Sequence, residues 1–334
     1  MRGRMKSQIK GLSSWAFAAA LLLTLFIPLA DSEERRAKAG ARNNAVQVRM
    51  RNIVYHFADN ITVHIRSLHG EIVPTGNNPF PIFDDKNSFI LKIAGGVIAI
   101  TPASMANVIN AHIGKSAESP IKDISIRIEN SQLKVRGKLR SSGVPFELDG
   151  TVSATAAGKI RLHANNIRAF KLPVRRLMDL FGVEVASLMK RGKLPGIQAE
   201  GDDLILSPEQ LLPPPRMQSK VTEVHLEANN IVQTFGTLDK QDKDRDNGNY
   251  MHYEGNRLKF GKLTMNDTDL TLLDLDASDP FDFYLAHYKE QLVAGYTKTT
   301  PSFGLRVYMV DFNKLGQSKS PRTAAKPGTS TTVR

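Results

Sequence analysis

The hydrophobic and polar residues of this chain alternate with a period of two in four consecutive segments near its middle. The first segment, Ile121–Glu129, alternates isoleucines with polar and charged residues. Three further segments repeat the pattern: 133–140, 144–152 and 159–164. A period of two is typical of β-strands with one buried face. The pattern therefore predicts four consecutive antiparallel strands.

Charge predicts the register between the second and third of these strands, because opposite charges are favoured directly across a strand pair. If Leu139 pairs with Val144, two pairs of opposite charge face each other: Arg136 with Glu147, and Lys134 with Asp149. The predicted register buries the apolar residues of both strands on the same face.

After Pro173 the apolar residues change to spacings of three and four, which indicate an amphipathic helix. Proline is favoured in the first turn of a helix, so we expect the helix to begin there. Its apolar face carries Leu177, Leu180, Phe181, Val185 and Leu188. We expect this face to lie against the predicted sheet.

Before this region, alternation predicts strands over 46–57, 61–73 and 89–100, the last with a kink or bulge at its two adjacent glycines. Thr101-Pro102 then predicts a capped helix that ends at Gly114.

After the middle region we expect a strand over 221–235, one or two strands over 258–275, a helix from Asp279-Pro280 to Gly295 and a last strand over 305–312. The sequence Ala-Asn-Asn-Ile occurs at 164–167 and again at 228–231, which predicts similar local geometry at both places.

The N-terminus has the pattern of a secretory signal segment. Four basic residues precede an apolar run over 16–30, and Ala30-Asp31-Ser32 offers small residues for cleavage. The alternative is an uncleaved anchor, but this run is shorter than the about 20 residues that span a bilayer.

We expect a charged tether over 33–44, the main domain over 45–236, a β-rich extension with one helix over 237–312 and a disordered basic tail over 313–334.

Charge and cysteine content narrow the function classes. The formal net charge is +12, but the first 32 residues carry +3 and the last 22 carry +5, which leaves +4 for the rest. This mild bias, together with export, argues against a nucleic-acid partner. The chain has no cysteine, so it can have neither disulfides nor thiolate metal ligands. We expect a protein of the bacterial periplasm or cell envelope.

The sequence carries no catalytic or nucleotide-binding motif, so we predict neither an enzyme nor a cofactor. His64, His163 and His225 lie on predicted polar strand faces and are expected to be solvated. In the aspartate-rich stretch 242–248 the glycine is seventh, whereas a calcium loop needs it sixth. We therefore expect a solvated loop there, and a calcium site is the alternative.

Five aspartates near the C-terminus are candidates for a hydrolytic carboxylate pair, and the alternative is that they lie on exposed strand faces. They are Asp267, Asp269, Asp274, Asp276 and Asp279.

The order of these elements resembles that of bacterial envelope lipid-binding proteins of the tubular lipid-binding (TULIP) type. The segments that carry the resemblance include Phe89–His112, Pro120–Ile124, Val144–Gly150, Gly158–Ile167 and Leu172–Leu188. It extends over roughly residues 46–235 and is nearest to the periplasmic phospholipid-binding group linked to mannan maturation in mycobacteria.

This resemblance implies an α+β fold in which a long, curved antiparallel sheet wraps around one or two amphipathic helices as a half-barrel. It also implies a non-enzymatic protein that holds the acyl chain of a phospholipid or fatty acid for transfer or presentation in the envelope. A peripheral contact with an anionic membrane is part of this expectation. The alternatives are an envelope interaction module with a closed core and, less favoured, a hydrolase.

We place the expected lipid groove on apolar residues of the helices and strands: Met105, Ile109, Ile126, Val135, Phe146, Leu162, Leu177, Leu180, Phe181 and Leu188. Four basic residues near the ends of the long helix are candidates for contacts with a head group, or else belong to its solvated face: Arg175, Arg176, Lys190 and Arg191.

Overall fold

The computed structural model describes most of the chain between residues 44 and 316. The ranges are 44–76, 78–114, 119, 121–169, 196–238 and 248–316. The predicted signal segment, the long helix after Pro173, the aspartates of the 242–246 stretch and most of the basic tail lie outside these residues.

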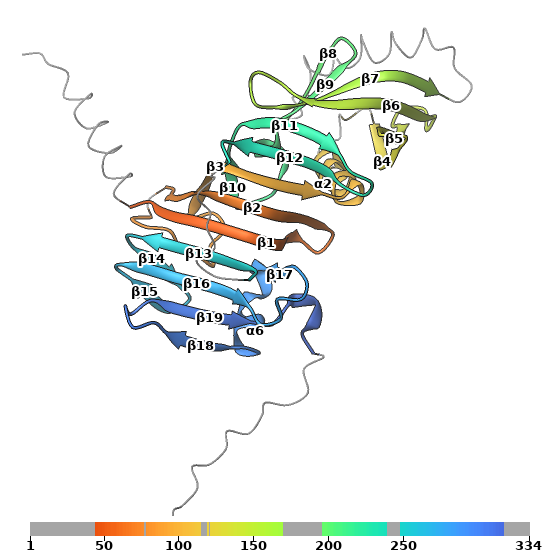
Figure 1. Ribbon diagram of the computed structural model, residues 1–334. Coiled ribbons are helices and arrows are strands. Elements are labelled where there is room, and N and C mark those ends of the chain that lie inside the picture. The colour runs from red at the N-terminus through yellow and green to blue at the C-terminus, as the bar shows by residue number, and fades with distance from the viewer. Residues whose placement is uncertain are drawn as a thin grey trace, which may run out of the picture. The chain divides into compact units, whose positions relative to one another are not determined.

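A large, mostly antiparallel sheet forms the body of the fold (Figure 1). Among the described residues it contains eleven strands, nine of them in the continuous order β11-β12-β3-β2-β1-β13-β16-β19-β18. The strands of this path are β1 (Val46–Ala58), β2 (Ile61–Pro74), β3 (Phe89–Ile100), β11 (Val221–Leu226), β12 (Ile231–Gly236), β13 (Tyr250–Gly255), β16 (Thr268–Asp274), β18 (Tyr296–Thr299) and β19 (Leu305–Met309). Two short strands pair beside this path: β10 (Arg216–Gln218) with β3, and β17 (Phe281–Tyr284) with β1.

A second sheet of six strands has the order β4-β5-β6-β7-β9-β8. Its strands are β4 (Ile121–Glu129), β5 (Gln132–Leu139), β6 (Pro145–Ala154), β7 (Ile160–Ala169), β8 (Ile197–Glu200) and β9 (Asp203–Leu206). The remaining elements are the hairpin β14 (Leu258–Phe260) and β15 (Leu263–Met265), the helices α2 (Pro102–Gly114), α5 (Pro208–Leu211) and α6 (Tyr288–Val293), and the 3-10 turns η2 (Leu285–His287) and η3 (Phe312–Lys314). The described chain is thus mostly β, with few helices, which agrees with the predicted α+β class.

The three long strands β1, β2 and β3 confirm the predicted alternation, because every second residue along most of their length is buried. The predicted irregularity in β3 is also confirmed. Gly95 pairs with His69, but the next pair joins Ile93 to Gly70, so Ala94 is an extra residue in the ladder. A side chain at Gly95 would collide with the Thr237 carbonyl, 2.0 Å from an ideal Cβ. Glycine therefore permits the close backbone approach at this bulge.

The neighbour of β1 changes at Asn52. Up to Arg51 the strand pairs with β13, and from Ile53 it pairs in parallel with β17. Asn52 lies between them in a left-handed conformation with φ of 53°, which asparagine tolerates better than most residues. Its side-chain amide donates to Asn249 Oδ1 at 2.7 Å, and its Oδ1 lies 2.7 Å from His64 Nε2. These contacts hold the junction between the two partner strands.

The register predicted from charge is confirmed in the smaller sheet. Arg136 lies opposite Glu147 and Lys134 opposite Asp149, and Leu139 N donates to the Val144 carbonyl at 2.9 Å. Arg136 Nε lies 2.5 Å from Glu147 Oε2. The two pairs are on the solvent face, so they specify the register more than they stabilise the fold.

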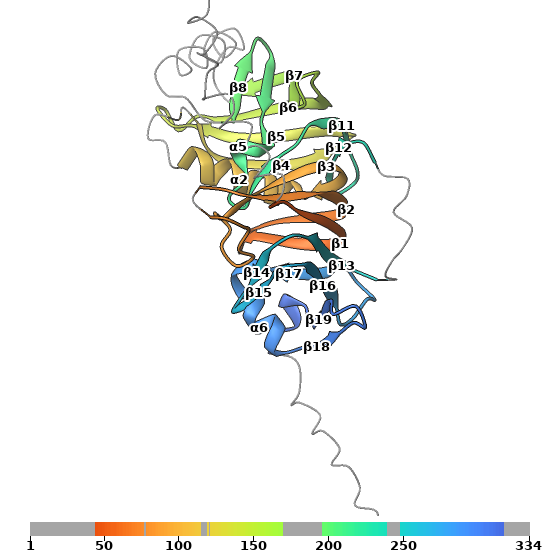
Figure 2. The same ribbon diagram turned by 90° about the vertical axis from the view of Figure 1, so that its left-hand side faces the viewer.

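Helix α2 follows β3 and precedes β4 along the chain, so it connects the two sheets, and it contacts β2 and β4 (Figures 1 and 2). Thr101 Oγ1 accepts from Ser104 N at 3.1 Å, as the predicted N-cap requires. At the other sheet, Asn110 Nδ2 donates to the Ile124 carbonyl at 2.7 Å and Asn110 Oδ1 accepts from Ile124 N at 2.9 Å. The Asn110 side chain thus pairs with β4 as a neighbouring strand would.

Three predicted elements are wrong. Where one or two strands were expected over 258–275, the chain forms three, β14, β15 and β16. The single strand expected over 221–235 is the hairpin β11–β12, which turns where Glu227 N donates to the Asn230 carbonyl at 2.9 Å. The helix expected from Asp279-Pro280 begins only at Tyr288, because Phe281–Tyr284 forms the buried strand β17. A buried strand of four residues can carry aromatic residues at any spacing, so the helical spacing there was coincidental.

The repeated Ala-Asn-Asn-Ile sequence has two different structures. At 228–231 it forms the turn of the β11–β12 hairpin. At 164–167 it lies inside β7, where Asn166 pairs with Asp149 and Ala164 with Gly150, so that Asn165 is bulged out of the ladder. The expectation of similar geometry is therefore wrong.

The free edge of β17 is closed by side chains instead of a strand. Gln291, which is fully buried, accepts from Tyr284 N at 3.0 Å and donates to the carbonyls of Asp282 and Val310 at 2.8 and 2.9 Å. Asp311 Oδ1 accepts from Asp282 N at 2.8 Å. These two side chains satisfy backbone groups that would otherwise be buried without partners.

We predict that Gln291→Ala lowers the free energy of unfolding by about 2 kcal/mol or more, since it leaves three buried backbone groups without partners at about 1–3 kcal/mol each. Urea unfolding followed by circular dichroism measures this change. Gln198→Ala, on the half-buried strand β8, is the control and should change stability by less than about 0.5 kcal/mol. Equal effects of the two substitutions would contradict this role of Gln291.

Candidate functional site

An apolar cavity of about 70 Å³ lies on the buried face of the larger sheet. Strands β1, β2 and β3 form its floor, with residues such as Tyr55, Val63, Ile65, Leu91 and Ile98. The segments that cover it contribute Met105 and Val108 from α2, Leu211 from α5 and Met217 from β10. Ile160 of β7 and Leu206 of β9 also line it, so both sheets contribute to one site.

The described lining contains no charged side chain, and its few polar groups are the Gln233 amide and the hydroxyls of Tyr55 and Tyr253. Burial raises the pKa of both tyrosines well above its usual value. Both hydroxyls therefore stay protonated near neutral pH. Such a surface can hold hydrocarbon but offers no group for acid, base or nucleophilic chemistry at neutral pH.

The described residues of the predicted groove are only partly brought together. Met105 lines the cavity, and Ile109 is a half-buried residue of the same helix. The other four, Ile126, Val135, Phe146 and Leu162, lie on the smaller sheet and pack into the same hydrophobic core, but they do not line the cavity.

Eight predicted site residues lie outside the described part of the chain: Leu177, Leu180, Phe181, Leu188, Arg175, Arg176, Lys190 and Arg191. The main lining of the cavity, on β1, β2 and β3, was not predicted, because the groove was expected on the middle strands and the helices. The uninterrupted alternation of β1, β2 and β3 was the signal that could have located it.

The size of the cavity limits what it can hold without rearrangement. One water needs about 10–15 Å³ of such space, and an engineered cavity of about 150 Å³ takes up benzene. The present volume therefore fits a short run of methylene groups, and a sixteen-carbon chain requires the cavity to widen. Met50, Met105 and Met217 are the lining residues best able to adjust, because methionine has three flexible torsions.

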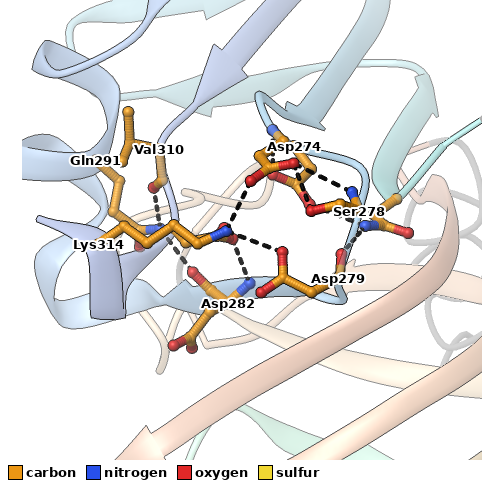
Figure 3. Close-up of polar contacts among 10 residues, drawn as sticks. Asp274, Ser278, Asp279, Asp282, Gln291, Val310 and Lys314 are labelled. Carbon is orange, nitrogen blue, oxygen red and sulfur yellow. Dashed lines mark hydrogen bonds and ion pairs between the residues drawn. The ribbon is translucent and has the colours of Figure 1, made fainter. Parts of the chain in front are cut away.

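The second candidate site is a cluster of carboxylates at the end of β16 (Figure 3). The ammonium of Lys314 lies 2.9 Å from Asp279 Oδ1, 2.9 Å from Asp311 Oδ2 and 3.0 Å from Asp276 Oδ2. Asp274 accepts from Asn249 Nδ2 at 2.8 Å beside them. The lysine side chain occupies the position between the carboxylates where a bound cation would otherwise balance their charge.

Three of the five candidate aspartates therefore converge, namely Asp274, Asp276 and Asp279. Asp267 and Asp269 do not join them: Asp269 lies at the other end of β16, opposite Glu254. Burial raises the pKa of Asp274 to about 6. Hydrogen bonds from Ser278 and Lys314 lower the pKa of Asp276 to about 2. Burial also raises the pKa of Asp311.

Within the described ranges no three histidine or carboxylate side chains are arranged to hold a metal ion. His163 Nδ1 instead lies 2.7 Å from Asp203 Oδ1, and His225 lies 3.4 Å from Glu223 Oε1. Burial lowers the pKa of His64, which is bonded to Asn52. The possible calcium loop lies outside the described residues, apart from Gly248.

No family model, curated protein or solved structure matches this chain. Among the helices of the described segments, none has the length and apolar character needed to cross a membrane. The TULIP resemblance thus stays a prediction, and function has to be argued from the cavity itself.

We predict that Asp274 makes the protein more stable as the pH falls from about 7 to about 5. A folded-state pKa near 6, raised from the usual 3.8, means that the folded protein binds a proton more readily than the unfolded chain. The gain is complete below the unfolded pKa and is lost as the pH rises through the folded pKa. Urea unfolding at both pH values should show a smaller pH difference in Asp274→Asn than in the wild type. An unchanged difference would contradict the assignment.

Removing the central cation should also destabilise the carboxylate cluster. We predict that Lys314→Met lowers stability more at about pH 7 than at about pH 3, where Asp311, whose pKa is raised, has lost its charge. Thermal unfolding at the two pH values measures the effect. Lys262→Met, at an exposed lysine on the β14–β15 turn, is the matched control and should have little effect at either pH. Identical behaviour of the two variants would show that the cluster does not depend on Lys314.

Proposed function

We propose that this protein binds the hydrocarbon chain of a lipid in the apolar cavity and has no catalytic role. The observation that carries the proposal is a cavity on the largest sheet whose described lining contains no charged side chain. Protein interiors are usually close-packed at such a position. A protein interior usually leaves few voids larger than a water molecule. An apolar void of several water volumes is therefore a site that a hydrocarbon can fill.

The energetics favour a chain that enters by widening the cavity. Each buried methylene contributes about 0.8 kcal/mol, so a sixteen-carbon chain offers on the order of 12 kcal/mol before ordering costs. Burial of about four methylenes offers only about 3 kcal/mol, which corresponds to binding weaker than about 1 mM. Binding of biological strength thus requires the cover to move.

The cover is the part of the cavity wall best suited to such movement. Helix α5 has four residues and β10 has three, whereas the floor strands have 12 to 14. Short elements form fewer backbone hydrogen bonds and open locally at lower free energy than long central strands. We propose that the chain enters between α2 and the α5–β10 segment.

The N-terminal signal pattern and the absence of cysteine support a site of action in the periplasm or cell envelope of a bacterium. There the protein would hold a phospholipid or fatty acid for transfer or presentation, as the TULIP resemblance implies. The curved half-barrel and peripheral contact with an anionic membrane belong to the same proposal.

A second candidate function is an envelope interaction module that binds no ligand. The small volume of the cavity favours this alternative, because it can be read as a packing defect of a large β-protein. The hydrolase alternative is weaker, since two of the five candidate carboxylates, Asp276 and Asp279, are paired with the Lys314 ammonium.

We predict that Met105→Trp, which places a larger side chain in the cavity wall, weakens the uptake of a fluorescent fatty alcohol by at least about tenfold. The reason is that the indole occupies the volume that the hydrocarbon chain would fill. Fluorescence titration of purified protein measures the affinity. Leu263→Trp, at a position that is 46 % exposed on β15, is the control and should bind as the wild type does.

The two outcomes separate the candidate functions. Uptake by the wild type that is lost only in Met105→Trp supports the cavity as the lipid site. Absence of uptake by the wild type, or equal uptake by both tryptophan variants, would contradict it and leave the interaction module as the better reading.

A further inference from the structure

The Gln233 amide in the cavity lining has no hydrogen-bond partner among the described residues. Gln233 on β12 is 6 % exposed and points to the buried face of the sheet, on the same side as Phe235. Its amide makes no hydrogen bond with any other described residue, although Gln291, also buried, makes three. Both side chains end in an amide, but only the amide of Gln291 forms hydrogen bonds with described residues.

An unpartnered amide in an apolar wall is unfavourable for the empty protein. A polar amide that has no hydrogen-bond partner is less favourable in an apolar wall than a hydrocarbon side chain of similar size. The neighbours of Gln233 across the sheet are apolar: Ile98 on β3 and Val224 on β11. Leucine would fill this position without that penalty, so packing alone does not account for glutamine here.

We propose that Gln233 recognises an uncharged oxygen group of the ligand, such as an ester carbonyl or a hydroxyl, inside the cavity. This inference rests on the proposed function and specifies its ligand class. A glutamine amide can both donate and accept, so it suits an ester, an alcohol or an amide. The described lining has no cation to balance a carboxylate, and burying an unpaired charge is far more costly than burying an ester. The geometry therefore points to a neutral lipid ester or alcohol in preference to an ionised fatty acid.

The position of Gln233 also determines the direction in which the hydrocarbon chain of the ligand would cross the floor of the cavity. Tyr55, the nearest hydroxyl-bearing strand residue of the floor, is on β1, three strands from β12 in the sheet order. Adjacent strands are about 4.8 Å apart, so the two groups are separated by about 14 Å across the sheet. Between them the floor is formed by Val63, Ile65 and Ile98. A polar group bound at Gln233 would thus direct its hydrocarbon over an aliphatic surface toward the Tyr55 end.

Four eight-carbon probes test this inference on the full chain: n-octane, 1-octanol, methyl octanoate and octanoate. Their affinities are obtained from the rise in melting temperature with probe concentration. We expect the wild type to bind 1-octanol and methyl octanoate more tightly than octanoate. In Gln233→Leu the affinity for 1-octanol relative to n-octane should fall about tenfold, the effect of losing one buried hydrogen bond.

A matched control and a second variant keep the test decisive. Gln198→Leu, on β8 outside the cavity, should keep the wild-type preference. Gln233→Met preserves side-chain length and should behave as Gln233→Leu does. Without any probe, both Gln233 variants should melt at a higher temperature than the wild type, because an unsatisfied group is removed.

The experiment distinguishes failure of the proposed lipid-binding function from failure of the proposed role of Gln233. If the wild type responds to none of the four probes, the proposed function is wrong and Gln233 has no ligand. If n-octane and 1-octanol bind but their ratio is unchanged in both Gln233 variants, or if those variants melt at a lower temperature, the role of Gln233 is wrong while the apolar site stands.

Discussion

The structure depends on covering the apolar faces of β1, β2 and β3. These strands are 12 to 14 residues long and bury alternate residues along most of their length. A single sheet cannot bury its own face, so other elements must pack on it. The chain has no cysteine with which to reinforce this packing, so the hydrophobic core is the main source of stability.

The cover of these strands includes both aromatic residues and short elements. Toward the C-terminal elements, Phe83 packs edge to face against Tyr253, Phe260 and Tyr288, with ring centroids 5.0 to 5.6 Å apart. Interlocked aromatic rings of this kind fill space well. Phe83 and Tyr253 also line the cavity, and the rest of its cover comes from short elements and from residues such as Met105 and Met217. The candidate site therefore lies where aromatic residues and short elements together cover the long strands.

Local sequence patterns predicted the strands in which buried and exposed residues alternate regularly along the whole strand. Alternation predicted β1 to β7, and the opposed charges of Lys134 and Asp149 were sufficient to predict a register. The N-cap of α2 was equally local, because Thr101 bonds a backbone group three residues away. The partners of strands that are distant in sequence could not be predicted, since β1 pairs with β13 and β17 from more than 190 residues later. The convergence on Lys314 and the unpartnered amide of Gln233 depend on the same long-range contacts.

The central claim is that the core leaves room for hydrocarbon, and native mass spectrometry of protein purified without detergent tests it most directly. The account predicts a bound species of lipid mass that is released on unfolding and recovered by organic extraction as a neutral ester or alcohol. A single species at the mass of the polypeptide alone, with no extractable lipid in repeated preparations, would contradict it.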